Sequence, residues 1–244
     1  MIPDTGAARP VMVLLHGLGI DSAMWQPQLH GLAEHMEIHA PNLPDFGEGD
    51  ARIGSVRAAA DQLGADLEAR RLGSVYLCGL SLGGMVAMAL ASRRPAGVRG
   101  LIVSGAQVRV SLWLRTLLLG VGRLVPERVL LSGTNLPPQA GPDLRDAEQR
   151  FAQRLGKAGI LVAMRTAAET DLTEDLSRIT CPTLVLCGER DNPLNRSAAR
   201  RIAATVPGAQ LRFIPGAGHV WNLEQPDRFN SELLRFVDAV ERRA

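Results

Sequence analysis

Short runs of continuous apolar residues alternate along the chain with segments in which apolar residues recur at helical spacing. The continuous runs predict buried strands at 11–15, 74–78, 100–105, 183–187 and 210–214. The periodic segments predict helices at 55–73, 84–94, 197–205 and 226–241. Strands that are apolar throughout and alternate with helices predict an α/β fold, a mainly parallel twisted sheet with helices on both faces.

The alternation stops between residues 107 and 179. This stretch is rich in helix formers, and TNLPPQAGP at 134–142 is a connection marked by proline and glycine. An insertion of roughly seventy residues is too long for an ordinary loop between two strands. We therefore expect a small helical cap at 107–179 on a core formed by residues 1–106 and 180–244.

The composition excludes several classes of protein. Hydrophobic residues make up 46% of the 244 positions and the formal net charge is +2, as expected of a globular protein with a sizeable core. No basic cluster is interleaved with aromatic residues, so we expect no nucleic-acid partner. Cys78, Cys181 and Cys187 lack metal-ligand spacing, which favours a reduced, cytoplasmic protein without a metal site. Charges interrupt the apolar stretch 112–131, so we expect no membrane span.

The segment LCGLSLGGMVAMAL at 77–90 places Ser81 between glycines at the end of an apolar run. Its GLSLG stretch matches the pattern G-x-S-x-G between a predicted strand and a predicted helix. This setting is typical of a nucleophile elbow, a sharp turn that raises the serine oxygen above the sheet. A glycine-rich turn with an incidental serine would give the same pattern, so the function of Ser81 depends on partners elsewhere in the chain.

A serine nucleophile needs a base, and the base needs an acid that orients it. With a nucleophile elbow, the chain order is nucleophile, acid, histidine. His219, in the loop PGAGHVWN, is the only histidine that follows Ser81. The segment TLVLCGERDNP offers Asp191 and Glu189 as the acid. Asp191 lies farther into the turn and is the better candidate, while Glu189 is the alternative.

Two backbone N–H groups are candidates for stabilising an oxyanion. One belongs to Leu82, the first residue of the helix after the nucleophile, and the other to Leu18 in the loop HGLG after the first strand. We also expect Gly17, Trp25 and Val220 to contact the substrate. Gly17 and Trp25 lie in or near the oxyanion loop in sequence, and Val220 follows the predicted base.

Four segments together resemble the α/β-hydrolase superfamily in their order, spacing and setting: LLHGLGIDSAMW, GLSLGGMVAMALASRRP, PTLVLCGERDNP and PGAGHVWNLEQPDRFN. The resemblance covers nearly the whole chain. It implies the α/β-hydrolase fold, a Ser81–His219–Asp191 triad, an acyl-enzyme intermediate and no cofactor. A serine at the elbow differs from the haloalkane dehalogenase and epoxide hydrolase branches, which carry an aspartate there. The elbow segment is most similar to enol-lactone hydrolases and small carboxylesterases. NLPDFGEGD at 42–50 departs from the usual Asp-Leu-Pro-Gly-His-Gly run.

We therefore expect a serine hydrolase that cleaves a small, largely apolar carboxylic ester, lactone or thioester. The aliphatic run at 111–125 favours a compact apolar substrate if it roofs the site. The expected partner is a small-molecule substrate, and the expected assembly is a monomer or a homodimer. The same triad could serve carbon–carbon bond hydrolysis or acyl transfer, or be retained in a small-molecule receptor. The intact catalytic segments favour the enzyme.

Overall fold

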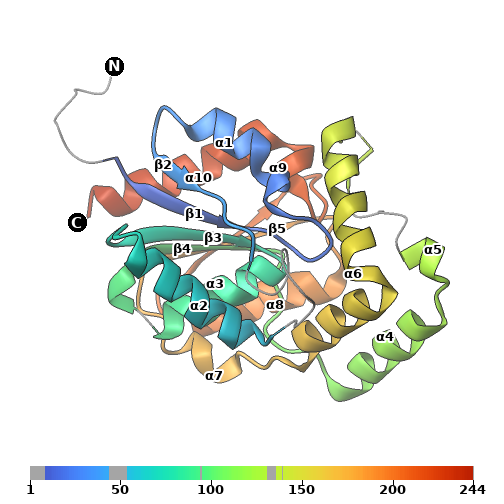
Figure 1. Cartoon of the computed structure of the whole chain (residues 1–244). Helices are drawn as coiled ribbons and strands as arrows, with labels where there is room; N and C mark the ends of the chain where they lie inside the picture. The colour runs from blue at the N-terminus through green and yellow to red at the C-terminus, as the bar shows by residue number, and fades with distance from the viewer. Residues whose placement is uncertain (1–8, 44–53, 94, 131–135, 139, 244) are drawn as a thin grey trace.

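The centre of the protein is a six-stranded parallel sheet (Figure 1). The computed structural model describes residues 9–43, 54–93, 95–130, 136–138 and 140–243. Residues 44–50 of the NLPDFGEGD run, and residues 134, 135 and 139 of the proline-marked connection, lie outside this described part. The strands are β1 Val11–Leu15, β2 Glu37–His39, β3 Val75–Leu80, β4 Val98–Ser104, β5 Thr183–Gly188 and β6 Gln210–Ile214. They lie in the order β2-β1-β3-β4-β5-β6.

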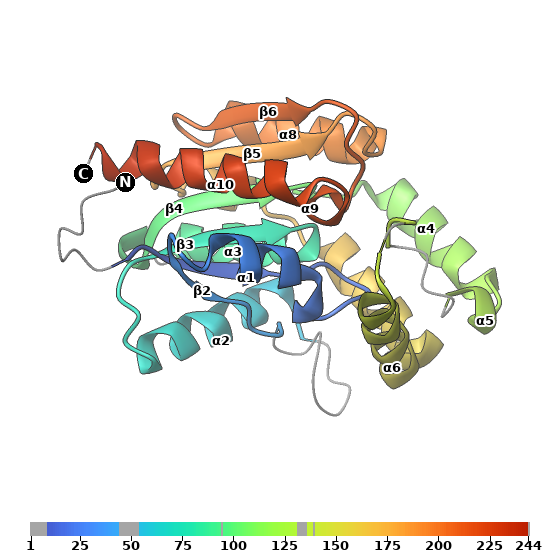
Figure 2. The same ribbon diagram turned by 90° about the horizontal axis from the view of Figure 1, so that it is seen from above.

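Helices cover both faces of the sheet, which confirms the expected fold class. One face carries α1 Gln26–Leu32 and α10 Pro226–Glu241, and the other carries α2 Val56–Ala69, α3 Leu82–Arg93 and α8 Pro193–Thr205 (Figures 1 and 2). Side chains alternate between the two faces along β1, as the period of a strand requires. Met12 and Leu14 pack into the cluster that includes α10, whereas Val13 and Leu15 pack into the cluster that includes α3.

The bounds of β1, β6 and α10 agree with the sequence prediction, but the end of α2 does not. The Oγ of Ser55 accepts a hydrogen bond from the N–H of Ala58 at 3.0 Å and caps the start of this helix. The sequence suggested that the helix runs to Gly73. It ends instead at Ala69, because the chain turns at Arg71 with a φ of 55°. Gly73, with a φ of 68°, belongs to the connection into β3 and is not the C-cap.

The helices α4 Leu112–Leu124, α5 Glu127–Leu130 and α6 Pro142–Glu169 lie together beyond the carboxyl ends of the strands (Figures 1 and 2). The run of α6 consists of two helices, because Gly156 interrupts it with φ 58° and ψ 178°. After it, α7 Thr173–Leu176 packs under α3, and Leu172 and Ile179 on either side of it join the core cluster. The division into a core and a cap at 107–179 stays a proposal.

Several short elements at the strand ends have no counterpart in the sequence pattern. They are the 3-10 helices η1 Ser22–Trp25 and η2 Pro95–Gly97 and the single turn α9 Trp221–Glu224. Such short pieces carry too few residues for a periodic signal. None of the helices in the described part of the chain combines the length and the apolar character needed to cross a membrane.

Candidate active site

Ser81 is the single residue between β3 and α3. Its backbone has a φ of 56°, in the left-handed region that a side chain other than glycine rarely adopts. Its N–H donates to the carbonyl of Ser104 at 2.8 Å, and its carbonyl accepts from the N–H of Met85 at 3.2 Å. These bonds fix the turn to the end of β4 and to the first turn of α3. The local conformation is the one expected of a nucleophile elbow.

The glycines around Ser81 are required by close backbone packing. A Cβ on Gly79 would overlap the backbone of Gly83, and a Cβ on Gly83 would overlap the carbonyl of Leu15. A Cβ on Gly17 would lie 3.5 Å from the Cβ of Ser81, so the loop after β1 lies directly against the serine. These contacts explain why the segment around Ser81 carries glycine despite its cost in an element interior.

His219 and Asp191 form a hydrogen-bonded pair. The Nδ1 of His219 lies 2.9 Å from the Oδ2 of Asp191, and the side chain of Asp191 is only 1% exposed. The other oxygen, Oδ1, accepts from the N–H of Asn192 at 2.7 Å and from the Nδ2 of Asn195 at 2.9 Å. Glu189, the alternative acid, points elsewhere, because its Oε2 accepts from the N–H of Gly216 at 3.3 Å.

The hydrogen bonds to Asp191 decide its charge. Burial by itself would raise the pKa of Asp191, but the bonds from His219, Asn195 and the backbone of Asn192 outweigh burial and hold the pKa below its usual value. An ionised Asp191 accepts a hydrogen bond from the N–H at Nδ1 of His219. This leaves Nε2 as the acceptor in the neutral imidazole, a tautomer assigned from the bonding partners. The 3.1 Å approach of Asn195 Nδ2 to Nδ1 is then a contact between two donors.

The end of β4 connects this pair with Ser81. Gly105 follows Ser104, whose carbonyl binds the N–H of Ser81. A Cβ on Gly105 would lie 3.0 Å from both the Oδ2 of Asp191 and the Nδ1 of His219, and Gly105 has a φ of 58°. Ser81 follows β3, and Asp191 and His219 follow β5 and β6, so all three lie at the carboxyl edge of one parallel sheet, which is where open α/β sheets bind ligands.

A cavity of about 200 Å³ opens beside Ser81. Both candidate oxyanion donors belong to residues of its wall, which is otherwise mostly apolar and includes side chains from α3 and α6. The lining residues are Leu18, Ser81, Leu82, Met85, Gln107, Val110, Met164, Ala167 and Ala168. The cavity therefore lies between the core and the helices of the proposed cap.

The predicted substrate contacts lie in different environments. Gly17 lies against Ser81, as described above. Trp25 has no exposed surface and packs in the core with its ring centroid 5.7 Å from that of Phe229. Trp25 is therefore a core residue and not a substrate contact, which corrects the prediction. Val220 packs against the same core cluster and is outside the cavity wall described above, so its contact with substrate stays a prediction.

His16 lies in the loop that also carries Gly17 and Leu18, and its hydrogen bonds are structural ones to backbone groups. It is fully buried, and burial lowers its pKa. Its Nε2 accepts from the N–H of Leu43 at 2.9 Å, so its Nδ1 carries the proton and donates to the carbonyl of Gly17 at 2.9 Å. A neutral His16 thereby ties the loop after β1 to the loop after β2.

Sequence reasoning missed two polar residues, Asn195 and Gln107. Asn195 lies on the first turn of α8, four residues after Asp191, and donates to its carboxylate. Gln107 follows the end of β4, and its Nε2 donates to the Oδ1 of Asn195. The helical spacing from Asp191 could have indicated Asn195. Gln107 carries no such signal, because its partner is distant in the sequence.

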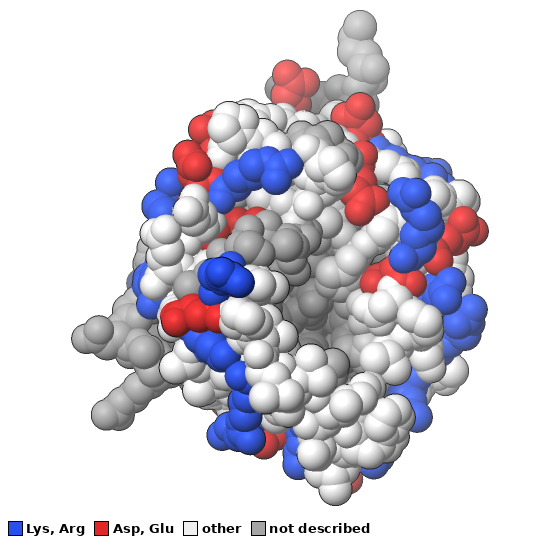
Figure 3. Space-filling model, turned by 90° about the vertical axis from the view of Figure 1, so that its right-hand side faces the viewer, with Lys and Arg blue, Asp and Glu red and all other residues white. Residues whose placement is uncertain are grey.

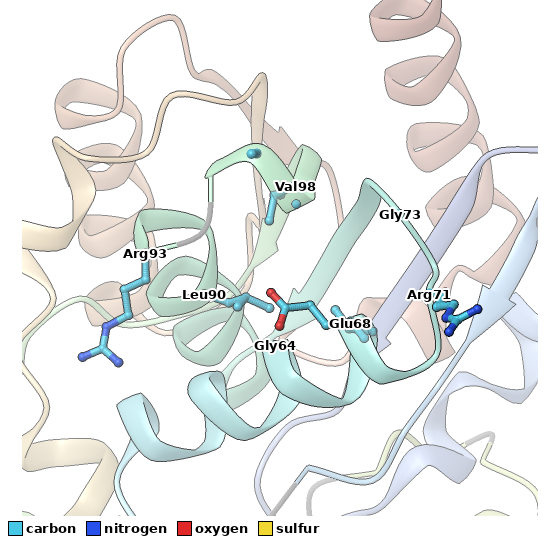
Figure 4. A pocket seen from close by; sticks show the side chains of 10 residues that line it. Gly64, Glu68, Arg71, Gly73, Leu90, Arg93 and Val98 are labelled. Atoms are coloured by element: carbon cyan, nitrogen blue, oxygen red, sulfur yellow. The ribbon is translucent and has the colours of Figure 1, made fainter.

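A larger cavity, of about 710 Å³, lies elsewhere (Figure 4). It is lined by residues of α2, α3 and the start of β4, such as Gly64, Leu90 and Val98. This is the amino end of β4, whereas ligands of parallel sheets bind at the carboxyl ends. No candidate site residue lines this cavity. In the described part of the chain, no group of three or more histidine, cysteine or acidic side chains is placed to hold a metal ion.

Comparison with known proteins shows the family to which the chain belongs. Residues 12–232 match the model of the alpha/beta hydrolase family. The chain is 31% identical, over 95% of its length and 96% of the relative's, to the pimeloyl-[acyl-carrier protein] methyl ester esterase of Xanthomonas oryzae pv. oryzae strain MAFF 311018. It is 28% identical, over 95% of its length and 92% of the relative's, to the putative carbamate hydrolase RutD of Escherichia coli strain K12 / DH10B.

Two solved structures have the same fold. The thermophilic esterase of Thermogutta terrifontis matches with a TM-score of 0.79 and 26% identity, over 96% of this chain and 91% of the other. The enol-lactonase of Burkholderia xenovorans LB400 also matches with a TM-score of 0.79, at 22% identity over 96% and 94% of the two chains. The family match and the similarity over nearly the full length lead to one conclusion: this chain belongs to the alpha/beta hydrolase family.

Proposed function

We propose that this protein is a serine hydrolase that cleaves a small, largely apolar carboxylic ester, lactone or thioester through an acyl-enzyme intermediate. The observation that carries the proposal is the 2.9 Å bond between His219 Nδ1 and the buried Asp191, at the same edge of the sheet as a serine with a φ of 56°. In the proposal, the oriented imidazole of His219 takes the proton of Ser81 on its strand-to-helix turn, which is how a hydroxyl is activated in acyl transfer.

In the proposed reaction, the Oγ of Ser81 attacks the substrate carbonyl while Nε2 of His219 takes its proton. Asp191 stays ionised and stabilises the imidazolium that forms. The N–H groups of Leu18 and Leu82 donate to the oxyanion of the tetrahedral intermediate. His219 then returns the proton to the leaving alcohol or thiol. A water molecule, activated by the same imidazole, cleaves the acyl-enzyme and regenerates Ser81.

The cavity and the relatives support the proposed substrate class. The cavity volume of about 200 Å³ is below the usual range for small-molecule sites, roughly 300–1,000 Å³, and favours a compact group. Met85, Val110 and Met164 make the cavity wall apolar. Relatives named as a methyl ester esterase and a carbamate hydrolase support hydrolysis of an ester-like bond. The three cysteines, all buried and unpaired, fit the proposed reduced, cytoplasmic location.

A panel of p-nitrophenyl esters from acetate to octanoate tests the proposal. We expect turnover that is highest for short acyl chains and that Ser81→Ala abolishes without a change in the thermal melt. The matched control is Ser231→Ala, which removes an exposed hydroxyl on α10 that donates to the carbonyl of Asp227. A Ser81→Ala protein with a tenth of wild-type activity would contradict the assignment. Absence of turnover across the panel would favour the receptor.

A further inference from the structure

A second hollow adjoins the cavity that contains Ser81. It has a volume of about 360 Å³ and lies between residues 107–111 and α8. We call it the Gln107 groove, because Gln107 lines both hollows. The two hollows therefore border the same side chain, and the groove lies next to the cavity. Figure 3 views the molecule from the side on which α4 and α6 lie, and this face is hollowed near its centre.

The walls of the Gln107 groove combine an apolar floor with polar rims. Val108 and Ala198 are buried and form the floor. One face of α8 forms one wall, because its groove residues recur at helical spacing. These residues are Leu194, Ser197, Ala198 and Arg201. The segment that leaves β4 forms the opposite wall with Gln107, Arg109 and Ser111.

The groove has an excess of positive charge. Its lining includes two guanidinium groups, Arg109 and Arg201, and no carboxylate. Arg109 approaches Asp171 next to the groove at 3.6 Å through Nε, with both side chains more than half exposed. Arg201 forms no ion pair with another residue in the described part of the chain. Two cations thus face one carboxylate, and the contact to that carboxylate is loose.

The state of Asp171 indicates which charge this environment favours. A hydrogen bond from Thr173 is the largest cause that lowers the pKa of Asp171, while burial opposes the shift. The charges of Arg109 and Arg201 lower this pKa further. The positive charges of both guanidinium groups therefore stabilise a carboxylate placed beside the groove.

We infer that the Gln107 groove binds a carboxylate of the substrate. The inference rests on the proposed function and narrows it to an ester with two parts, an apolar part at Ser81 and a free carboxylate several atoms away. Guanidinium groups match a carboxylate in shape and charge, and the hydroxyls of Ser111 and Ser197 add donors. The carboxylate lies on the acyl side or on the alcohol side of the ester, and the experiment distinguishes the two.

Matched pairs of esters test the groove. On the acyl side, mono-p-nitrophenyl adipate is compared with p-nitrophenyl hexanoate; on the alcohol side, carboxypentyl acetate is compared with hexyl acetate. We expect the wild type to prefer the charged ester of one pair. In Arg109→Gln/Arg201→Gln, kcat/KM for that ester falls about fivefold through KM, as exposed ion pairs predict. The neutral esters keep their rates, and about 1 M salt weakens the preference.

Arg70→Gln is the matched control, because Arg70 is exposed at the end of α2 and lies outside the groove. A direct binding arm makes the test independent of turnover: calorimetry with Ser81→Ala compares monomethyl adipate with methyl hexanoate, with and without the two arginines. Equal kcat/KM within both pairs, or a preference that survives the double substitution, would overturn the carboxylate site. Failure to hydrolyse even the neutral esters would instead contradict the proposed function.

Discussion

The central strands bury their apolar side chains, whereas helix α4 of the proposed cap leaves many of its apolar side chains exposed. Every residue of β3 is buried, and the strand lies in the middle of the sheet. On α4, Trp113 is 70% exposed and Leu124 is 84% exposed. This helix packs mainly against α6, so much of its apolar surface faces away from the core (Figure 2).

The difference in burial suits two separate roles, positioning the site residues and lining the cavity. In the core, close packing fixes the strand ends, and the strand ends hold Ser81, Gly105 and Asp191 in place. The segment 107–179, the proposed cap, contributes the apolar side chains of Val110 and Met164 to the cavity wall. We therefore propose that the core carries the chemistry and that the proposed cap selects the substrate.

Asp191→Asn gives the largest expected effect, because it removes the anion that orients His219. We expect kcat to fall about 10⁴-fold. Glu189→Gln is the matched control and should leave kcat within about twofold, since Glu189 binds the backbone of Gly216 and not the histidine. Steady-state kinetics with one p-nitrophenyl ester measures both. The reverse result would make Glu189 the acid.

Two glycine substitutions compare the core and the cap directly. Gly83→Ala places a methyl group against the carbonyl of Leu15 and should cost about 3 kcal/mol in the free energy of unfolding. Gly120→Ala on α4 meets no atom within 4 Å and should stabilise by about 0.5–1 kcal/mol, because glycine is a poor helix former. Urea denaturation measures both. Similar losses at the two sites would refute the contrast.

The pH dependence of stability tests the environment of Asp191. Its pKa in the folded state is lowered, so its contribution is fully present above the unfolded value, about 3.9, and is lost as pH falls through the folded pKa. We expect the difference in unfolding free energy between the wild type and Asp191→Asn to stay level from about pH 6 to about pH 5 and to shrink from about pH 4 downward. A difference that stays constant over this interval would show that the pKa of Asp191 is not lowered.

Leu124→Gln gives the smallest expected effect. Its side chain is 84% exposed, so we expect a change within about 0.5 kcal/mol in the free energy of unfolding. Leu101→Ala, at a fully buried position of β4, is the matched comparison and should cost about 2–5 kcal/mol. Thermal and urea melts report both values. A large loss with Leu124→Gln would mean that α4 is covered in solution.

Central strands such as β3 and β5 could be predicted because every residue in them is buried and their runs are therefore apolar. The short edge strand β2 was not predicted, because its three residues are not buried and carry no continuous apolar run. Helix α10 could be predicted because proline begins it and one face repeats regularly. The end of α2 could not be predicted, because Arg71 adopts a positive φ of 55°, a conformation normally expected of a glycine such as Gly73. The burial of individual side chains could not be predicted either. Trp25 closely follows the oxyanion loop in sequence, yet its side chain is fully buried in the core.

In the candidate site, too, only residues with a local sequence signal could be predicted. Ser81, His219 and Asp191 carry local signals, namely a glycine-flanked turn, a loop after a strand, and an acidic residue late in a turn. The structure brings Asp191 rather than Glu189 to His219, and the roles of these residues stay predictions. Gln107 could not be found from sequence, because its bond to Asn195 joins residues that only the fold brings together.

The central claim is that His219 activates Ser81. A fluorophosphonate probe, followed by mass spectrometry of the labelled peptide, tests it most directly. We predict one adduct per chain on Ser81 in the wild type, and labelling slowed by orders of magnitude in His219→Ala, because the hydroxyl has lost its base. His35→Ala, at an exposed histidine outside the site, should label at the wild-type rate. An adduct on another residue, or undiminished labelling of Ser81 in His219→Ala, would contradict the account.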